Sequence, residues 1–167
     1  MIPLKDASLL QTGAFINGQW RADAGASPVI VTNPATGEEV ARVAGADQKP
    51  TVEAIEPADA AQADWAGTPA KERSAIIRRW YELCVEHADD LAAILTAEQG
   101  KPLAEAKGEI LYGAAFFEWY AEEAKRVYGE TIPSPDRNRR MAVMKQPIGV
   151  CAAITPWNFP MAMIPRK

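Results

Sequence analysis

The stretch that decides the fold reads Gly149-Val150-Cys151-Ala152-Ala153-Ile154-Thr155-Pro156-Trp157-Asn158-Phe159-Pro160. Its first half is a short apolar run, which predicts a buried strand over residues 150–154 of a parallel sheet. Its second half is a rigid turn, and we expect a helix to begin near Pro160. In α/β folds the carboxyl ends of parallel strands present side chains to a ligand. The stretch therefore predicts an α/β fold with a binding site at this turn.

Asn158 is the side chain of the turn that we expect to take part in chemistry. Its amide NH₂ group can donate a hydrogen bond to an oxyanion, and donors held in place for developing charge are usually the largest electrostatic contribution to acyl-type catalysis. The alternative is structural, because asparagine is a favoured N-cap for a helix starting near Pro160. Spacing alone favours the cap.

The first 45 residues carry the signals of short strands and tight turns. The dipeptide Asn17-Gly18 predicts a hairpin over residues 15–20, because both residues tolerate positive φ. Residues 29–31 and 39–43 are predicted strands on either side of a turn at residues 33–37. We expect these strands to form one small β-meander.

Two helical patterns follow. Asp47 is the predicted cap of the first, which contains Pro57, and an interior proline costs about 3 kcal/mol or kinks a helix. Thr68 and Pro69 predict the next start, as N-cap and first helical residue. The apolar positions then recur at helical spacing up to Gly100, with a break predicted near residues 88–90.

The last long pattern covers residues 103–128 and is closed by Gly129. Its aromatic residues recur at helical spacing, so we interpret them as core and interface packing rather than a stacking platform. Residues 140–145 alternate as a strand after a proline-rich turn.

Composition excludes several classes of protein. The 167 residues carry a net charge of −4. The sequence has no stripe of aromatic and basic residues, so a nucleic-acid partner is not predicted. The arginines at 137, 139 and 140 are interpreted as a solvated loop or strand end. Residues 146–165 are uncharged but contain four prolines, which argues against a membrane span because lipid cannot replace the missing amide donors. No targeting segment is evident, so we expect a cytoplasmic protein.

The chemistry of the cysteines and the histidine is equally restricted. Cys84 and Cys151 are far apart in the sequence, which favours two free thiols in a reducing compartment. Cys151 lies in the apolar run and is expected to be buried and inert. His87, the one histidine, is interpreted as a helix residue, and no metal site or Ser-His-Asp triad is predicted. Neither common glycine-rich nucleotide fingerprint occurs.

Five motifs carry a resemblance to a known family. They are Ile16-Asn17-Gly18-Gln19-Trp20, Thr32-Asn33-Pro34-Ala35-Thr36-Gly37-Glu38, Glu98-Gln99-Gly100-Lys101-Pro102-Leu103, Gln146-Pro147-Ile148-Gly149-Val150 and Ile154-Thr155-Pro156-Trp157-Asn158-Phe159-Pro160. In this order they resemble the amino-terminal part of an aldehyde dehydrogenase. Residues 95–106 and 163–167 are most similar to the succinate-semialdehyde dehydrogenases of that family.

The resemblance implies a mechanism, in which a cysteine thiolate attacks an aldehyde, hydride passes to NAD or NADP, and a glutamate-activated water releases the acid. Asn158 matches the residue that stabilises the oxygen of the thiohemiacetal. Ile154, Thr155, Pro156 and Trp157 match the turn beside the nicotinamide and its ribose. Arg166 matches a residue that binds the far carboxylate of succinate semialdehyde, and Lys167 matches a basic residue of the active-site network. Family members are also oligomers, so a homo-oligomer is implied.

The same resemblance sets expectations for domain organisation. Residues 1–167 match an incomplete dinucleotide-binding domain, with an oligomerisation arm at about residues 130–147. The family's nucleophile, general base and adenosine-ribose residues match positions beyond Lys167, so we expect a truncated chain that lacks the catalytic domain, holds NAD or NADP only weakly and is inactive alone. The alternative is a non-catalytic, self-associating interaction module.

Pro57 and Pro165 depart from the family's pattern, which continues a helix at both positions. Pro165 cannot donate to the carbonyl of Met161, and its displacement of Arg166 would leave that residue on the surface.

Overall fold

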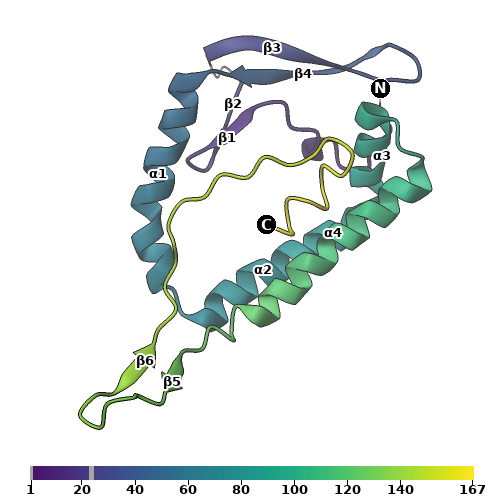
Figure 1. The fold of residues 1–167 in the computed structure, drawn as a ribbon. Coiled ribbons are helices and arrows are strands. Elements are labelled where there is room, and N and C mark those ends of the chain that lie inside the picture. The colour runs from purple at the N-terminus through teal and green to yellow at the C-terminus, as the bar shows by residue number, and fades with distance from the viewer. Residues whose placement is uncertain (1, 23–24) are drawn as a thin grey trace.

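The computed structural model describes residues 2–22 and 25–167. A 3₁₀ turn, η1 (Ala7–Leu9), precedes two hairpins, β1 (Ala14–Ile16) with β2 (Gln19–Arg21) and β3 (Gly25–Thr32) with β4 (Glu39–Ala46). The helices α1 (Gln48–Gly67), α2 (Ala70–Glu86), α3 (Ala88–Gln99) and α4 (Leu103–Glu123) follow. A third hairpin joins β5 (Glu130–Ile132) to β6 (Met141–Val143). Figure 1 shows the first two hairpins and the helices arranged as a frame that the carboxy-terminal segment crosses.

The hairpins form as the sequence predicts, but they do not combine into a meander. Asn17 and Gly18 have φ values of 50° and 75°, as a two-residue hairpin turn requires. Within the described residues, β1 pairs with β2 and β3 pairs with β4 as two separate sheets. The two hairpins run in different directions (Figure 1), so β2 does not present its edge along β3. The meander was therefore a wrong prediction.

The helix boundaries follow local capping chemistry. The Oδ1 atom of Asp47 accepts a hydrogen bond from the Lys49 amide at 3.0 Å, which confirms the predicted cap. The helix α1 continues without a break through Pro57. Thr68 ends α1 and Pro69 is the N-cap of α2, one residue later than predicted, because the Thr68 amide still donates to the Trp65 carbonyl.

The remaining helix ends agree in part. The break between α2 and α3 falls at His87, and Gly100 ends α3 in the left-handed conformation with a φ of 84°. The helix α4 ends at Glu123 rather than at residue 128. The chain turns there through short hydrogen bonds, one of which joins the Tyr128 amide to the Arg126 carbonyl at 2.8 Å.

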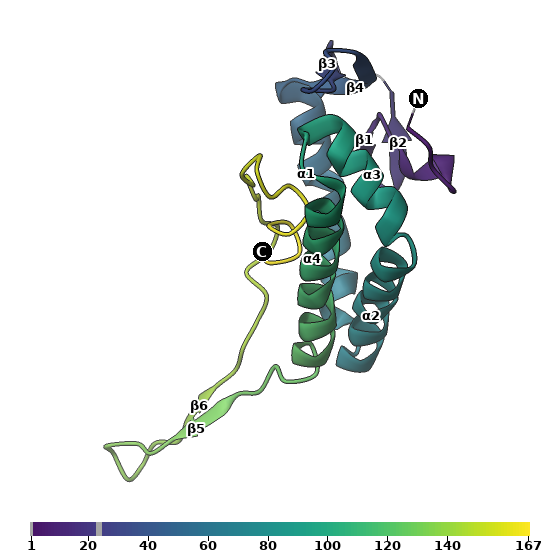
Figure 2. The ribbon, with the colours of Figure 1, turned by 90° about the vertical axis from the view of Figure 1, so that its right-hand side faces the viewer.

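The core lies where α4 packs against α2 and α3, and Figure 2 shows α2 and α4 side by side. The buried face of α4 consists of Ala106, Glu109, Ile110, Gly113, Ala114, Phe117 and Ala121. The Phe117 ring stacks on Trp80 of α2 with centroids 4.2 Å apart. The packing interpretation of the aromatic residues is thus confirmed for Phe117, whereas Trp119 is 64% exposed.

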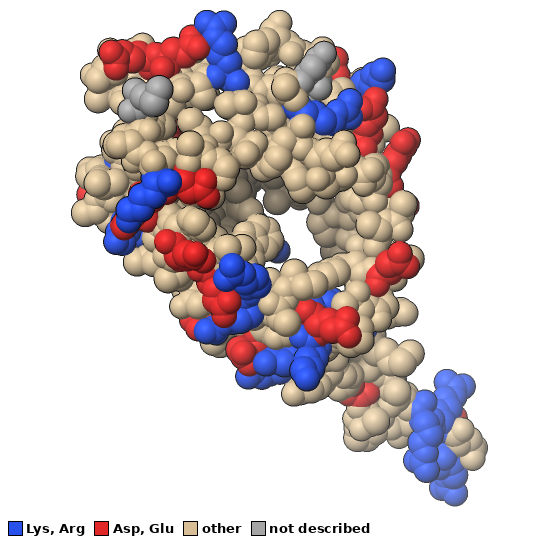
Figure 3. Space-filling model, turned by 180° about the vertical axis from the view of Figure 1, so that it is seen from behind, with Lys and Arg blue, Asp and Glu red and all other residues tan. Residues whose placement is uncertain are grey.

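The β5–β6 hairpin and its connecting loop, which we name the arm, project away from the helices (Figures 1 and 2). Every residue of its two strands is exposed. Basic side chains gather at the far end of the arm (Figure 3), where Arg137, Arg139 and Arg140 lie. Among the described residues, no helix has the length and apolar character that a membrane span requires.

Candidate functional site

The segment that leads into the predicted site is not a strand. Residues 150–154 have no regular secondary structure, and Ile154 is 98% exposed. The strand prediction was wrong because a parallel strand needs hydrogen-bonding neighbours, and no described segment pairs with these residues. Cys151 is exposed for the same reason, so the expected burial of its thiol was also wrong.

The predicted helix after Asn158 is replaced by a series of turns over residues 157–166. The Met163 amide donates to the Phe159 carbonyl at 3.2 Å, and the Ile164 amide donates to the Met161 carbonyl at 3.2 Å. Pro165 cannot donate to that Met161 carbonyl, as predicted, and Ile164 takes its place. Pro165 would lie inside the expected helix and lacks the amide hydrogen that the regular hydrogen-bond ladder needs there, whereas Pro160, at its first position, would remove no hydrogen bond of the helix.

Asn158 lies in these turns with its side chain available. Its backbone carbonyl accepts from Lys101 Nζ at 2.9 Å and from Gln99 Nε2 at 3.3 Å. Within residues 2–22 and 25–167, no hydrogen bond uses its side-chain amide, and no helix starts behind it. The capping alternative is therefore not the role of this side chain here, and its NH₂ group can meet a ligand.

A buried carboxylate anchors the turns at residues 161 and 162. Glu109 Oε1 accepts from the backbone amides of Met161 and Ala162 at 3.1 and 3.2 Å. Glu109 Oε2 is paired with Lys101 Nζ, and the two side chains are 1% and 12% exposed respectively. The ammonium of Lys101 also lies 4.3 Å from the ring centroid of Phe159, within the range of a cation–π contact.

Sequence reasoning missed this pair, although a signal was present. Glu109 occupies the apolar face of the third helical pattern, beside Ile110. Charged residues are almost never fully buried unless they are paired, so a carboxylate on that face indicates a partner. The partner could not be named because Lys101 and the turn reach it from outside the helix.

Gly113 allows the turn to lie directly on α4. A Cβ atom built at this position would lie 2.6 Å from the Sδ atom of Met161 and 3.2 Å from the Cα atom of Ala162. Ala162 is fully buried in consequence. The turn is thus held to α4 by close packing as well as by hydrogen bonds.

Arg166 and Lys167 follow the anchored turn and are exposed. The guanidinium carbon of Arg166 lies 5.9 Å from the ring centroid of Phe116 on α4. Among the described residues, no carboxylate forms an ion pair with Arg166. Pro165 is buried beside it. The structure therefore brings Asn158 and Arg166 onto one segment beside α4 and leaves both polar groups accessible.

Ile154, Thr155, Pro156 and Trp157 approach the turn as extended chain. Ile154 and Trp157 are 98% and 70% exposed, whereas Thr155 is half-buried. The side chains of Ile154 and Trp157 therefore present apolar surface to solvent. Burial raises the pKa of the Cys84 thiol in the helical core, so that cysteine is unsuited to act as a thiolate.

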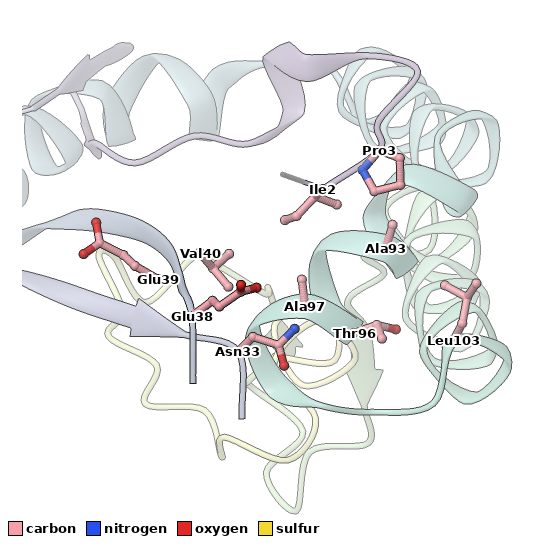
Figure 4. A pocket seen from close by; sticks show the side chains of 10 residues that line it. All are labelled: Ile2, Pro3, Asn33, Glu38, Glu39, Val40, Ala93, Thr96, Ala97 and Leu103. Carbon is pink, nitrogen blue, oxygen red and sulfur yellow. The ribbon is translucent and has the colours of Figure 1, made fainter. Parts of the chain in front are cut away.

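A separate cavity of about 400 Å³ lies between the β3–β4 connection and α3 (Figure 4). Its lining includes Asn33, Glu38 and Thr96 and contains none of the predicted site residues. Across the described chain, no group of three or more histidine, cysteine, aspartate or glutamate side chains is placed to hold a metal.

Comparisons with known proteins identify the family of the chain. The aldehyde dehydrogenase family matches residues 20–167, which is most of the chain. The chain belongs to the aldehyde dehydrogenase family. This aldehyde dehydrogenase chain is 58% identical to glutarate-semialdehyde dehydrogenase of Pseudomonas putida, over 98% of the chain and 34% of that relative. It is 54% identical to the succinate-semialdehyde dehydrogenase [NADP(+)] GabD of Escherichia coli, with the same two coverages of 98% and 34%.

The solved structures extend the match to the fold. Succinate-semialdehyde dehydrogenase from Burkholderia pseudomallei superimposes with a TM-score of 0.94 at 58% identity, over 98% of this chain and 34% of that chain. The chain therefore spans about a third of the length of the relatives it matches. The expected mixed α/β aldehyde dehydrogenase fold is confirmed, as is the resemblance to the semialdehyde dehydrogenases.

Proposed function

We propose that these residues belong to an NAD(P)-dependent dehydrogenase that oxidises an aldehyde to an acid. The availability of the Asn158 side chain, on a turn anchored from both ends, carries the proposal. Its amide NH₂ would donate to the aldehyde-derived oxygen while negative charge develops there. NAD or NADP, when bound, would accept the hydride, and Ile154, Thr155, Pro156 and Trp157 would lie beside it.

We further propose that the substrate is a semialdehyde with a remote carboxylate, with succinate semialdehyde as the first choice. Two relatives are named for glutarate and succinate semialdehydes. Arg166 is exposed and lacks a carboxylate partner in the described chain, and a guanidinium suits a carboxylate through its planar fork of donors. Lys167 would add positive charge to the same network.

Residues 1–167 alone are expected to show no aldehyde oxidation. The Cys84 thiol is buried with a raised pKa, and Cys151 matches no family nucleophile, so Asn158 would supply only part of the oxyanion site. The purified chain should be assayed for NAD(P)H formation with succinate semialdehyde. A full-length enzyme carrying the same 167 residues is the positive control, and turnover by the short chain that persists after repurification would contradict the expectation.

We propose that the arm, within residues 130–147, supports a homo-oligomer and that residues 1–167 form the beginning of a dinucleotide-binding domain. The arm strands are short and exposed, and unpaired strand edges can pair with another chain. Multi-angle light scattering across a range of concentrations should show species larger than the 18.1 kDa chain. An Ala142→Pro variant removes one amide donor from β6 and should reduce their proportion, whereas a parent chain that stays monomeric throughout would contradict the proposal.

A self-associating module without catalysis is the second candidate function. The large exposed apolar residues, among them Ile148 at 91% and Met144 at 80% exposed, favour it. Light scattering and the NAD(P)H assay separate the two candidates, because assembly without any turnover in the full-length protein would support the second. We also propose a cytoplasmic location, because free cysteines such as Cys84 and Cys151 are typical of proteins in a reducing compartment.

A further inference from the structure

We propose that Lys101 and Glu109 are positioning residues that hold the turn carrying Asn158 in place. Lys101 lies in the short connection between α3 and α4, and Glu109 lies on the buried face of α4. Neither residue was singled out by its own chemistry in the sequence. Their side chains converge on residues 158–162 through contacts that span 57, 52 and 53 positions of the chain.

The two residues hold the two ends of residues 158–162. Lys101 Nζ donates to the backbone carbonyl of Asn158 at 2.9 Å. Glu109 Oε1 accepts from the next two anchored amides, those of Met161 and Ala162. Because the pair uses backbone atoms of the turn, it fixes the path of the chain and leaves the Asn158 side chain free to meet a ligand.

Burial makes the arrangement sensitive to the loss of either partner. The side chains of Glu109 and Lys101 are 1% and 12% exposed, so each charge depends on the other for compensation. Breaking a buried ion pair by removing one partner leaves an uncompensated charge, which is strongly destabilising. The remaining charge would move toward water, and the backbone atoms that it holds would lose their partner.

The helices themselves do not need the pair for their packing. The helix α4 is held to α2 and α3 by apolar residues such as Ala92, Ile110 and Phe117, whereas the side-chain hydrogen bonds of Lys101 and Glu109 link them to each other and to the turn. The consequence for catalysis, a correctly placed Asn158 amide, rests on the proposed function. The positioning of the turn by Lys101 and Glu109 does not depend on that function.

Amide hydrogen exchange on the 167-residue chain tests the inference without any substrate. In Glu109→Ala, the amides of Met161 and Ala162 lose a charged acceptor, and exchange there should become at least about tenfold faster. Lys101→Met should accelerate the same two amides, because the carboxylate is left without its cation. Glu109→Gln keeps one oxygen acceptor but loses the negative charge, so the two amides should exchange faster than in the parent and more slowly than in Glu109→Ala.

Lys107→Met is the matched control, because it breaks an exposed ion pair on the same helix, that of Lys107 Nζ with Asp89 Oδ1 at 2.6 Å. It should leave the exchange of Met161 and Ala162 unchanged, and the amide of Ala114 within α4 should be unaffected in all four variants. The inference is overturned if either Lys101→Met or Glu109→Ala leaves the two amides at parental rates. It is also overturned if the acceleration spreads equally to Ala114 or if Glu109→Gln matches Glu109→Ala. Since exchange needs no turnover, an inactive full-length enzyme would refute the proposed function alone.

Discussion

Replacing Asn158 with alanine is expected to lower kcat by about 10²–10³-fold in a full-length aldehyde dehydrogenase that carries these 167 residues. Removing one donor from an oxyanion site typically has an effect of that size. KM should change far less, because the donor matters most when charge develops on the substrate oxygen. The side chain makes no hydrogen bond within the described chain, so its truncation removes no internal contact of that kind.

The measurement is a comparison of kcat and KM for parent and variants with one aldehyde and a saturating coenzyme. Asn158→Asp should be at least as impaired as the alanine variant, because a carboxylate accepts hydrogen bonds and repels an oxyanion. Gln99→Ala is the control, since it removes only a 3.3 Å hydrogen bond to the Asn158 carbonyl and keeps Lys101. Parental kcat in both Asn158 variants would exclude this residue from the oxyanion site.

The features that could be predicted from the sequence are those that neighbouring residues decide. Asn17 and Gly18 form their turn through their own tolerance of positive φ. Asp47 caps α1 by reaching an amide two residues away, and Gly100 ends α3 in the left-handed conformation. Each outcome depends on residues close together along the chain, so the local sequence pattern contains the necessary information.

The predictions that failed concern structure that depends on residues far apart in the sequence. Residues 150–154 have the composition of a buried strand, yet a strand exists only where neighbours pair with it, and none does so within the described chain. The helix expected near Pro160 would have needed an amide donor at residue 165, which Pro165 cannot supply. The anchoring of Met161 by Glu109 spans 52 positions, a distance over which spacing carries no signal.

In the predicted site, too, the local motif was found from the sequence and the long-range contacts were not. The motif of residues 154–160 drew attention to Asn158, and the structure leaves that side chain accessible. The motif of residues 98–103 contributed to the resemblance, but its physical role was not evident. That role lies in the reach of Lys101 and Gln99 across to the Asn158 carbonyl, a contact that requires α3, α4 and the turn to be folded together.

Replacing Arg166 with alanine in the same full-length enzyme should selectively impair a substrate that has a remote carboxylate. A bidentate guanidinium–carboxylate contact is charge-assisted and directional. Losing it should cost about 2–5 kcal/mol when the substrate carboxylate stays buried, which corresponds to a loss of roughly 30-fold or more in kcat/KM. The Arg166 side chain is exposed and contacts the Phe116 ring at 5.9 Å, so no described ion pair competes for it.

The measurement is kcat/KM for succinate semialdehyde and for butanal, an aldehyde of the same carbon number without the carboxylate. Arg166→Ala should lower the first value at least roughly 30-fold and change the second little. Arg166→Lys should recover only part of the loss, because an ammonium cannot reproduce the two parallel hydrogen bonds of a guanidinium. If Pro165 has instead displaced Arg166 from the substrate, both aldehydes will change little and alike. Equal losses for the two would remove the basis for a semialdehyde substrate, while membership of the aldehyde dehydrogenase family would stand on the match over residues 20–167.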